Sequence, residues 1–279
     1  MQPQLITGLA AIAPEYDALI CDVWGVLHNG HAAFSEAAAA LKKFRDHHGP
    51  VILLSNAPRP ASDLVRQFAH LGVPPDCYDA IITSGGATRV DLALRSQKGR
   101  LAMMHLGPPR DAPIYKGLDV EVVDPADAEI VLCTGLYDDD NETPEMYDPL
   151  LGELKARGLT MLCANPDIRV PRGPKMVWCA GALAAEYEEM GGEVVYYGKP
   201  YGPIYDVTLA AAKGASRPLA VGDGLFTDIK GANAAGIDAL FIADGLHGEE
   251  IEPYTPEHLA GLFERSGVSA RTVMRSLVW

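Results

Sequence analysis

Residues 18–27 read ALICDVWGVL, an apolar run that ends in the carboxylate of Asp22 and continues into a turn at Gly25. A short apolar run bounded by a turn signal predicts a buried strand. Asp22 then stands at the carboxyl end of that strand. Ligands of open α/β sheets bind at the carboxyl ends of the strands, so Asp22 is a candidate site residue.

The same pattern recurs outward from this stretch, because short apolar runs alternate with amphipathic helical stretches along nearly the whole chain. This alternation predicts an α/β fold with parallel sheets covered by helices on both faces. The expected strands cover residues 17–22, 51–55, 80–83, 101–106, 129–134, 159–164, 194–198, 219–222 and 239–243. The expected helices cover residues 35–48, 61–71, 147–157, 180–190, 204–213 and 228–235.

Polar residues follow several of these strands at the point where each strand ends. They are Ser55, Asn56, the segment 165–167, Lys199, Asp223 and Asp228. Two carboxylates, a lysine and a hydroxyl in one crevice suit phosphate chemistry. Carboxylate oxygens are the hard ligands that Mg²⁺ prefers, and a carboxylate can also act as a nucleophile that forms an acyl phosphate.

Each of these residues also has a purely structural interpretation. An Asp or Ser after a strand is usually a helix cap or a turn residue, and Lys199 before a proline could be an ordinary surface lysine. Asp223 and Asp228 flank a turn and could both cap the following helix. Their joint order at successive strand ends is what favours a shared site.

The composition excludes several classes of protein. The 279 residues carry a net charge of −14 and are 48% hydrophobic, which argues against disorder and against binding to nucleic acid or anionic membranes. The five cysteines form no CxxC motif, which is typical of buried thiols in the reducing cytoplasm. No apolar run approaches the length of a membrane span, and residues 1–16 lack a basic signal-peptide start.

Four motifs in order resemble the haloacid dehalogenase (HAD) superfamily of phosphohydrolases, and most closely its class IIA branch of NagD-like and p-nitrophenylphosphatase-like enzymes. The motifs are DVWGVL at 22–27, LSNAPRP at 54–60, YGKP at 197–200 and GDGLFTDI at 222–229, the last followed by GANAAG at 231–236. Between the second and third lie ITSG at 82–85 and NPD at 165–167, which are similar to class IIA landmarks.

This resemblance implies a doubly wound core of residues 1–83 and 181–279 with a smaller α/β cap domain inserted at 84–180. It implies an Mg²⁺-dependent phosphatase that hydrolyses a small organic phosphate and binds no nucleic acid or membrane. Asp22 would be the nucleophile and Lys199 its charge partner. Ser55 and Asn56 would contact the phosphoryl group, and Asp167 and Arg169 the substrate from the cap. The metal would be held by Asp22, the carbonyl of Trp24, and Asp223, with Asp228 beside them.

The chain departs from the family pattern at Trp24, where the family's phosphatases usually carry the aspartate that protonates the leaving group. An indole N–H donates a hydrogen bond but does not titrate usefully. Three interpretations follow. The protein is a phosphatase restricted to good leaving groups or using another donor such as His28; or it runs a different HAD-type reaction; or it is a phosphate sensor without turnover. The alternative interpretation of His28 is a solvated histidine in a loop without a catalytic role.

Other sequence features argue against competing functions. No G-x-G-x-x-G turn or G-x-S-x-G elbow supports an oxidoreductase or an esterase, and the roughly 100-residue insert argues against a receiver domain. The acidic run 138–142 lacks the glycine of a calcium loop and is interpreted as a solvated loop. The apolar end 277–279 is interpreted as packing surface, with a homodimer interface as the alternative.

Overall fold

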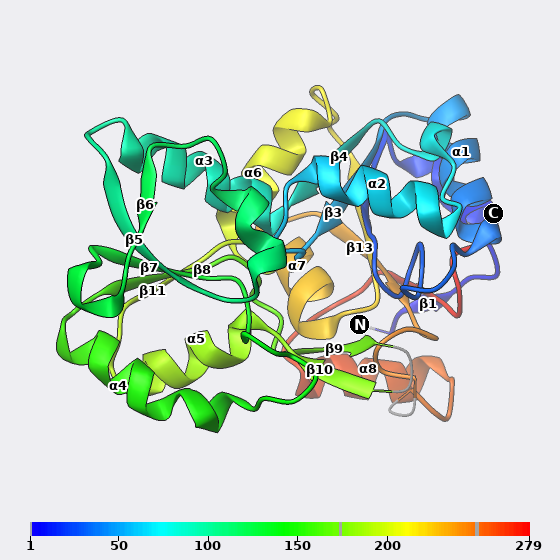
Figure 1. Ribbon diagram of the computed structural model, residues 1–279. Helices are drawn as coiled ribbons and strands as arrows, with labels where there is room; N and C mark the ends of the chain where they lie inside the picture. Colours follow the sequence, from blue (N-terminus) through cyan, green and yellow to red (C-terminus); the bar gives the residue numbers. More distant parts are fainter. Residues whose placement is uncertain (1, 173–174, 249–250) are drawn as a thin grey trace. The chain divides into compact units, whose positions relative to one another are not determined.

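The computed structural model describes residues 2–172, 175–248 and 251–279, and the chain divides into two compact units (Figure 1). The first unit holds residues 1–55, 64–82 and 199–279, and the second holds 56–63 and 83–198. Both are α/β layers, so the predicted fold class is confirmed. No helix of the described residues is long and apolar enough to cross a membrane.

The first unit is built on a sheet whose described strands follow the order β1-β14-β13-β12-β2-β3-β4. β2 is an internal strand and pairs in parallel with both β3 and β12. Every residue of β2 and β3 is buried, which explains why both read as continuous apolar runs. The strands are β1 (Gln4–Leu5), β2 (Ala18–Asp22), β3 (Val51–Ser55), β4 (Ala80–Thr83), β12 (Pro218–Gly222), β13 (Asp238–Ile242) and β14 (Thr272–Met274).

Helices pack against the faces of this sheet, to which successive side chains of each strand point in turn. Ile20 and Leu54 point to the face where Ile204 and Tyr205 of α6 pack, and Phe241 packs with α7 and α8. Phe44 of α1 is fully buried. The helices are α1 (Ser35–His47), α2 (Ala61–Leu71), α6 (Gly202–Ala211), α7 (Lys230–Ala235) and α8 (Pro256–Arg265).

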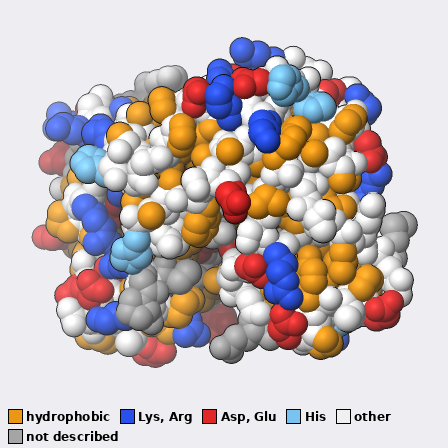
Figure 2. All heavy atoms as spheres, turned by 90° about the vertical axis from the view of Figure 1, so that its right-hand side faces the viewer, with side chains coloured by type: hydrophobic (Ala, Val, Ile, Leu, Met, Phe, Trp, Pro, Cys, Tyr) orange, Lys and Arg blue, Asp and Glu red, His pale blue; other side chains and the backbone are white. Residues whose placement is uncertain are grey.

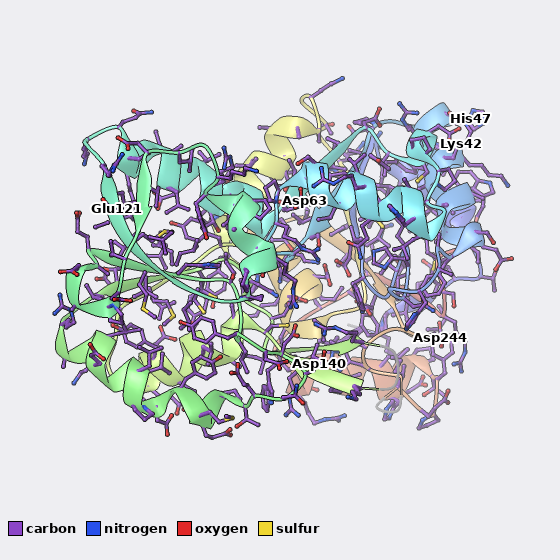
Figure 3. All side chains as sticks on the ribbon, viewed as in Figure 1. Lys42, His47, Asp63, Glu121, Asp140 and Asp244 are labelled. Carbon is purple, nitrogen blue, oxygen red and sulfur yellow. The ribbon has the colours of Figure 1, made fainter. Side chains whose placement is uncertain are left out.

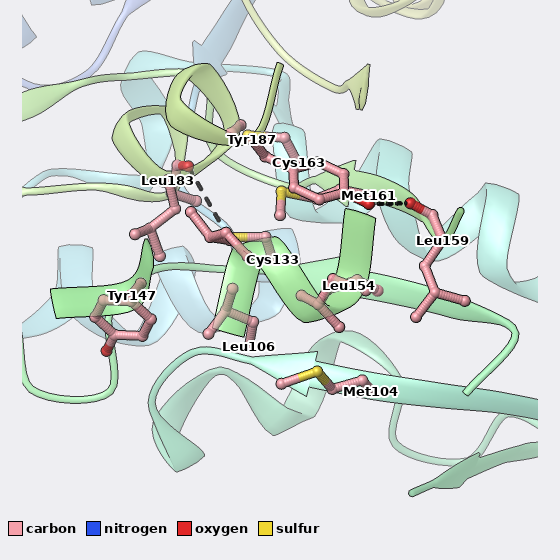
Figure 4. Packing of buried hydrophobic residues seen from close by; sticks show 14 of the residues in the cluster. Met104, Leu106, Cys133, Tyr147, Leu154, Leu159, Met161, Cys163, Leu183 and Tyr187 are labelled. Carbon is pink, nitrogen blue, oxygen red and sulfur yellow. Dashed lines mark hydrogen bonds between the residues drawn. The ribbon is translucent and has the colours of Figure 1, made fainter. Parts of the chain in front are cut away.

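The second unit has a parallel sheet of order β11-β8-β7-β5-β6 and an antiparallel hairpin, β9–β10. Tyr187 of α5 and Leu154 of α4 pack with Met104 and Cys163 on one face (Figure 4), whereas Leu92 of α3 packs on the other. The elements are α3 (Ser84–Ser96), β5 (Leu101–Leu106), β6 (Val120–Val122), β7 (Ile130–Cys133), α4 (Asp148–Ala156), β8 (Thr160–Cys163), β9 (Arg169–Arg172), β10 (Lys175–Trp178), α5 (Ala180–Glu189) and β11 (Val194–Tyr196).

The sequence-based division stays a prediction; it assigned residues 56–63, 83 and 181–198 to the core, whereas these residues cluster with the second unit. Residues 181–198 lie in the second unit, because β11 pairs with β8 and α5 packs in the same hydrophobic cluster. The apolar runs of α5 and β11 would fit either sheet, so hydrophobic periodicity alone did not indicate which sheet they join. That the second unit acts as a cap stays a proposal.

Candidate active site

Three carboxylates and one lysine meet at the carboxyl edge of the first unit's sheet. Asp22 is the last residue of β2, and Asp223 directly follows β12, its neighbour in the sheet. Asp228 lies in a π-helical turn at Leu225–Ile229 that leads into α7. Lys199 Nζ donates to Asp22 Oδ1 at 2.5 Å and to Asp228 Oδ1 at 2.7 Å. The structure thus brings together four of the predicted site residues.

This cluster is almost completely removed from solvent, which makes its charges interact strongly. The side chains of Lys199, Asp22 and Asp228 are only 4%, 9% and 7% exposed. Burial acts to lower the pKa of Lys199, but the two carboxylates outweigh it and hold the pKa well above its usual value. Lys199 is therefore a permanent cation at the centre of the cluster.

The carboxylates carry more negative charge than Lys199 balances. Burial, followed by repulsion from Asp22 and Asp228, raises the pKa of Asp223 well above its usual value. Burial and repulsion from Asp22 also raise the pKa of Asp228 to about 6, against the pull of Lys199. Three carboxylates with one ammonium leave an excess of negative charge that a divalent cation would relieve.

The donor set fits a hard divalent cation. Carboxylate oxygens of Asp22, Asp223 and Asp228 all lie within 4.8 Å of one another, and all three residues are buried. Oxygen ligands of this kind suit Mg²⁺, which is usually bound by one or two carboxylates while it keeps several waters. Asp22, Asp223 and Asp228 are the groups whose arrangement would hold it, and the backbone carbonyl of Trp24 as a further ligand stays a prediction.

Two glycines fix the position of Asp223, and the sequence analysis did not identify either as part of the site. A Cβ on Gly25 or on Gly245 would lie 2.1 Å from Asp223 Oδ2, so neither position tolerates a side chain without displacing the acid. Gly25 also has φ of +82°, which disfavours other residues. The N–H of Leu246 donates to Asp223 Oδ2 at 2.8 Å. The Asp-Gly pair at 244–245, one residue beyond the end of β13, was the available sequence signal.

The other predicted residues lie in three places. Ser55 ends β3 one residue beyond Leu54, the partner of Asp22 in the sheet, and it is buried. In the second unit, Asn56 Nδ2 donates to Asp167 Oδ1 at 2.8 Å, and Asp167 N–H donates to Asn165 Oδ1 at 3.1 Å. Arg169 stacks on Trp178 across the hairpin, 4.1 Å from the ring centroid.

Trp24 and His28 pack against each other in the loop after β2. Their rings meet edge to face at 5.2 Å, and His28 also contacts Phe68 at 5.9 Å. Gly30 lies directly under the Trp24 ring, since a Cβ there would be 2.5 Å from the indole. His28 is 2% exposed, so the solvated-loop interpretation is wrong.

His28 is also poorly suited to replace the missing acid. Burial lowers the pKa of His28 to about 4, and its Nδ1 accepts a hydrogen bond from Gly30 N–H at 3.1 Å. The imidazole is therefore neutral near pH 7 and carries no acidic proton of the imidazolium type. The burial follows from Phe68 on a distant helix, which no local pattern around residue 28 reveals.

Several charged groups elsewhere are paired with one another. Asp139, in the acidic run, is held by both Arg110 and Arg172, and Asp140, labelled in Figure 3, also lies near Arg172. The run is therefore engaged by arginines of its own unit. On the face in Figure 2, basic side chains are dispersed among acidic ones. All five cysteines are free and buried, and Leu277 at the apolar chain end is buried as packing surface.

Comparisons with known proteins agree with this geometry. The family described as haloacid dehalogenase-like hydrolase matches residues 19–121, and a HAD-hydrolase-like family matches 196–263. The ribonucleotide monophosphatase NagD of Escherichia coli K12 is 31% identical over 232 residues, which are 82% of this chain and 88% of NagD.

Solved structures show the same fold. A haloacid dehalogenase-like hydrolase of Brucella suis 1330 is 47% identical with a TM-score of 0.82, over 87% of this chain and 94% of that one. The glycerol phosphate phosphatase of Mycobacterium tuberculosis, solved in complex with magnesium, is 22% identical with a TM-score of 0.65, over 88% of this chain and 73% of that one. The chain therefore belongs to the haloacid dehalogenase superfamily of hydrolases, in the class IIA branch that contains NagD and the p-nitrophenylphosphatases.

Proposed function

We propose that this chain is an Mg²⁺-dependent phosphatase that transfers the phosphoryl group of a small organic phosphate first to Asp22 and then to water. The observation that carries the proposal is the buried cluster of Asp22, Lys199, Asp223 and Asp228 at the carboxyl edge of the sheet. Its relatives include enzymes named for nucleotide and glycerol phosphate monoesters, which supports a small phosphate monoester as substrate.

The residues present account for each part of this reaction. An oxygen of the Asp22 carboxylate forms a bond to phosphorus while the bond from phosphorus to the leaving oxygen breaks. Water then hydrolyses the acyl phosphate and restores the carboxylate. Lys199 holds Asp22 in place and balances its charge, and Ser55 at the end of β3 holds the phosphoryl oxygens. A bound Mg²⁺ would supply further positive charge for the phosphoryl oxygens.

The proposal includes a preference for good leaving groups. In this family the residue two after the nucleophile protonates the leaving oxygen, and here that residue is Trp24. The nearby His28 is buried and neutral. General acid catalysis typically contributes about 10²–10⁴-fold, so its loss penalises alkyl phosphates most. The leaving groups of aryl and acyl phosphates are weaker bases, so their departure depends less on protonation.

Replacing Trp24 by aspartate should raise the ratio of kcat/KM for glycerol 3-phosphate over p-nitrophenyl phosphate by about 10-fold or more, because it restores a leaving-group acid. Both rates are measured by phosphate release. Trp24→Asn is the matched control, since it removes the same packing on Gly30 and His28 without adding an acid. An equal change of the ratio in both variants would show that the missing acid does not limit turnover.

Removal of divalent cations should abolish hydrolysis, and Mg²⁺ should restore it. Mg²⁺ should also raise the melting temperature of the wild type, because it binds the native carboxylates and relieves their repulsion. Asp223→Asn should lose most of this thermal shift. Asp244→Asn is the control, because Asp244 also follows a sheet strand but is paired with Arg275. An undiminished shift in the Asp223 variant would contradict the metal assignment.

The second candidate function is a sensor that binds a phosphorylated metabolite without turnover, and the replacement of the acid at Trp24 is the observation that favours it. The two functions separate when hydrolysis and ligand-induced thermal shifts are measured on the same protein. Binding of phosphate monoesters without any hydrolysis of p-nitrophenyl phosphate in Mg²⁺ would favour the sensor.

A further inference from the structure

Tyr205 of α6 connects the hydrophobic core of the first unit to the turn that carries Asp228. Its side chain packs with Ile20 of β2 and Leu54 of β3. The residue is only 2% exposed, and its hydroxyl donates to the backbone carbonyl of Asp228 at 3.3 Å. A buried hydroxyl on a helix is therefore bonded to the backbone of a residue in the carboxylate cluster.

The carbonyl that accepts this hydrogen bond belongs to an irregular turn. Leu225–Ile229 is a π-helical turn, closed by a hydrogen bond from Ile229 N–H to the Gly224 carbonyl at 3.1 Å. Such a turn has one residue more than an α-helical turn, and it is frequent at functional sites. Because its backbone departs from the regular α-helical pattern, a donor on another element can help to fix its conformation.

Two glycines allow close contacts on either side of this hydrogen bond. A Cβ on Gly222, the last residue of β12, would lie 2.3 Å from Asp228 Cβ. A Cβ on Gly231, in α7, would lie 2.3 Å from the hydroxyl oxygen of Tyr205. The Asp228 side chain therefore packs on the end of β12, and the Tyr205 hydroxyl packs on the backbone of α7. Neither group can move far without a clash.

Asp228 is linked to Asp22 through the ammonium of Lys199. Asp228 Oδ1 accepts from Lys199 Nζ at 2.7 Å, and the same ammonium donates to Asp22 Oδ1. Asp228 Oδ2 accepts from the N–H of Gly224 at 3.1 Å, which ties the carboxylate to its own turn. A shift of the Asp228 backbone would therefore move Lys199 or lengthen one of the two hydrogen bonds that the lysine makes.

We propose that Tyr205 is a positioning residue for the phosphatase reaction, because its hydroxyl fixes the turn that carries Asp228. Through Lys199, Asp228 then holds the Asp22 carboxylate in the orientation for attack on phosphorus. This proposal rests on the proposed phosphatase function. Tyr205 acts through the backbone of Asp228 and not on the substrate. A misplacement of about 1 Å can cost about 100-fold in rate, so the loss of one hydroxyl is expected to affect turnover.

The test compares two tyrosines that make the same kind of hydrogen bond. Tyr205→Phe should lower kcat for p-nitrophenyl phosphate at saturating Mg²⁺ by about threefold to tenfold, the effect of one lost hydrogen bond, with little change in KM. Tyr187→Phe is the matched control, because the buried Tyr187 hydroxyl donates to the Leu159 carbonyl at 2.6 Å in the core of the second unit. Both variants should lower the melting temperature, but only Tyr205→Phe should lower kcat.

A double-mutant cycle tests whether Tyr205 acts through Asp228. Asp228→Asn keeps the carbonyl that accepts the hydrogen bond but removes the negative charge that holds Lys199. In this background, measured at high enzyme concentration, Tyr205→Phe should lower kcat by less than about twofold. The same loss of kcat in both backgrounds would show a general weakening of the fold and would overturn the positioning role. Gly231→Ala, which displaces the hydroxyl without removing it, should lower kcat in the same direction as Tyr205→Phe.

The positioning role can fail independently of the phosphatase. If the wild type hydrolyses p-nitrophenyl phosphate but Tyr205→Phe loses no more kcat than Tyr187→Phe, the positioning role is overturned while the phosphatase stands. If the wild type is inert, the phosphatase is overturned, and the positioning of Asp228 is decided by Mg²⁺ titrations that follow the melting temperature. The Mg²⁺ concentration at half the maximal shift should then rise by about threefold or more in Tyr205→Phe only. Equal concentrations in both variants, or no shift in the wild type, would overturn it as well.

Discussion

Replacing Asp22 by asparagine should reduce kcat for p-nitrophenyl phosphate by about 10³-fold or more, because the variant lacks the nucleophile that accepts the phosphoryl group. Asparagine keeps the shape of the side chain but not its charge, so the loss reports on chemistry more than on packing. The measurement is the release of p-nitrophenolate with Mg²⁺ in excess. Mass spectrometry of the acid-quenched wild type should detect a phosphoryl adduct that the variant lacks.

Asp244→Asn is the matched control for this experiment. Asp244 follows β13 as Asp22 ends β2, but its carboxylate is exposed and paired with Arg275 (Figure 3). This variant should keep close to full activity. If Asp22→Asn retains activity within a few-fold of the wild type, Asp22 is not the nucleophile. If both variants and the wild type are inert while phosphate monoesters still raise the melting temperature, the sensor function is favoured.

Replacing Lys199 by methionine should destabilise the metal-free protein by about 3–5 kcal/mol, because it leaves two buried carboxylates without their cation. Lys199 donates to both Asp22 and Asp228, and all three side chains are less than a tenth exposed. The change should also reduce kcat strongly. The free energy of unfolding is measured by urea denaturation of protein stripped of divalent cations, and kcat at saturating Mg²⁺.

The pH dependence gives this prediction a second readout. The pKa of Asp228 is already raised to about 6 with Lys199 present, and the loss of the lysine raises it further. Protonation of Asp228 at low pH removes its uncompensated charge, so the destabilisation should be larger at pH 8 than at pH 5. Lys42→Met, which removes an exposed lysine bonded to Asp46, should change stability by less than about 1 kcal/mol. Equal effects of the two variants would contradict a buried charge cluster.

The positions of the site carboxylates could be predicted because strand ends are well marked in this sequence. β3 (Val51–Ser55) and β5 (Leu101–Leu106) begin and end where the apolar runs predict, and β2 ends at Asp22 as expected. Buried parallel strands read as continuous apolar runs, and the first polar residue marks the carboxyl edge. The juxtaposition of Asp22 and Asp223 then follows from the pairing of β2 with β12.

Elements without such a pattern were missed. β9 (Arg169–Arg172) carries two arginines and a proline, and its hairpin with β10 shows no alternation of apolar residues. α3 (Ser84–Ser96) begins with Ser-Gly-Gly, which are poor helix formers, and only the Thr83 cap, whose side chain accepts from Gly86 N–H, marks its start. The edge strand β1 and its neighbour β14 are two and three residues long. Long-range packing determines all of these.

The buried contacts that the sequence did not reveal join residues that lie far apart in the chain. Nothing in the sequence around residue 59 shows that its Nε is buried beside Asp111, more than fifty residues away. The burial of His28 against Phe68 is of the same kind. Such contacts can be seen only in the folded structure, whereas the carboxylates at the strand ends could be predicted from the local sequence pattern.

The absence of side chains at Gly25 and Gly245 has a consequence for how this enzyme can be altered. Gly25 and Gly245 place backbone without side chains next to Asp223. No side chain at either position can therefore be exchanged to change the pKa or the position of Asp223. A library that randomises both positions should return glycine among its active members. Engineering of specificity then has to work through positions other than Gly25 and Gly245.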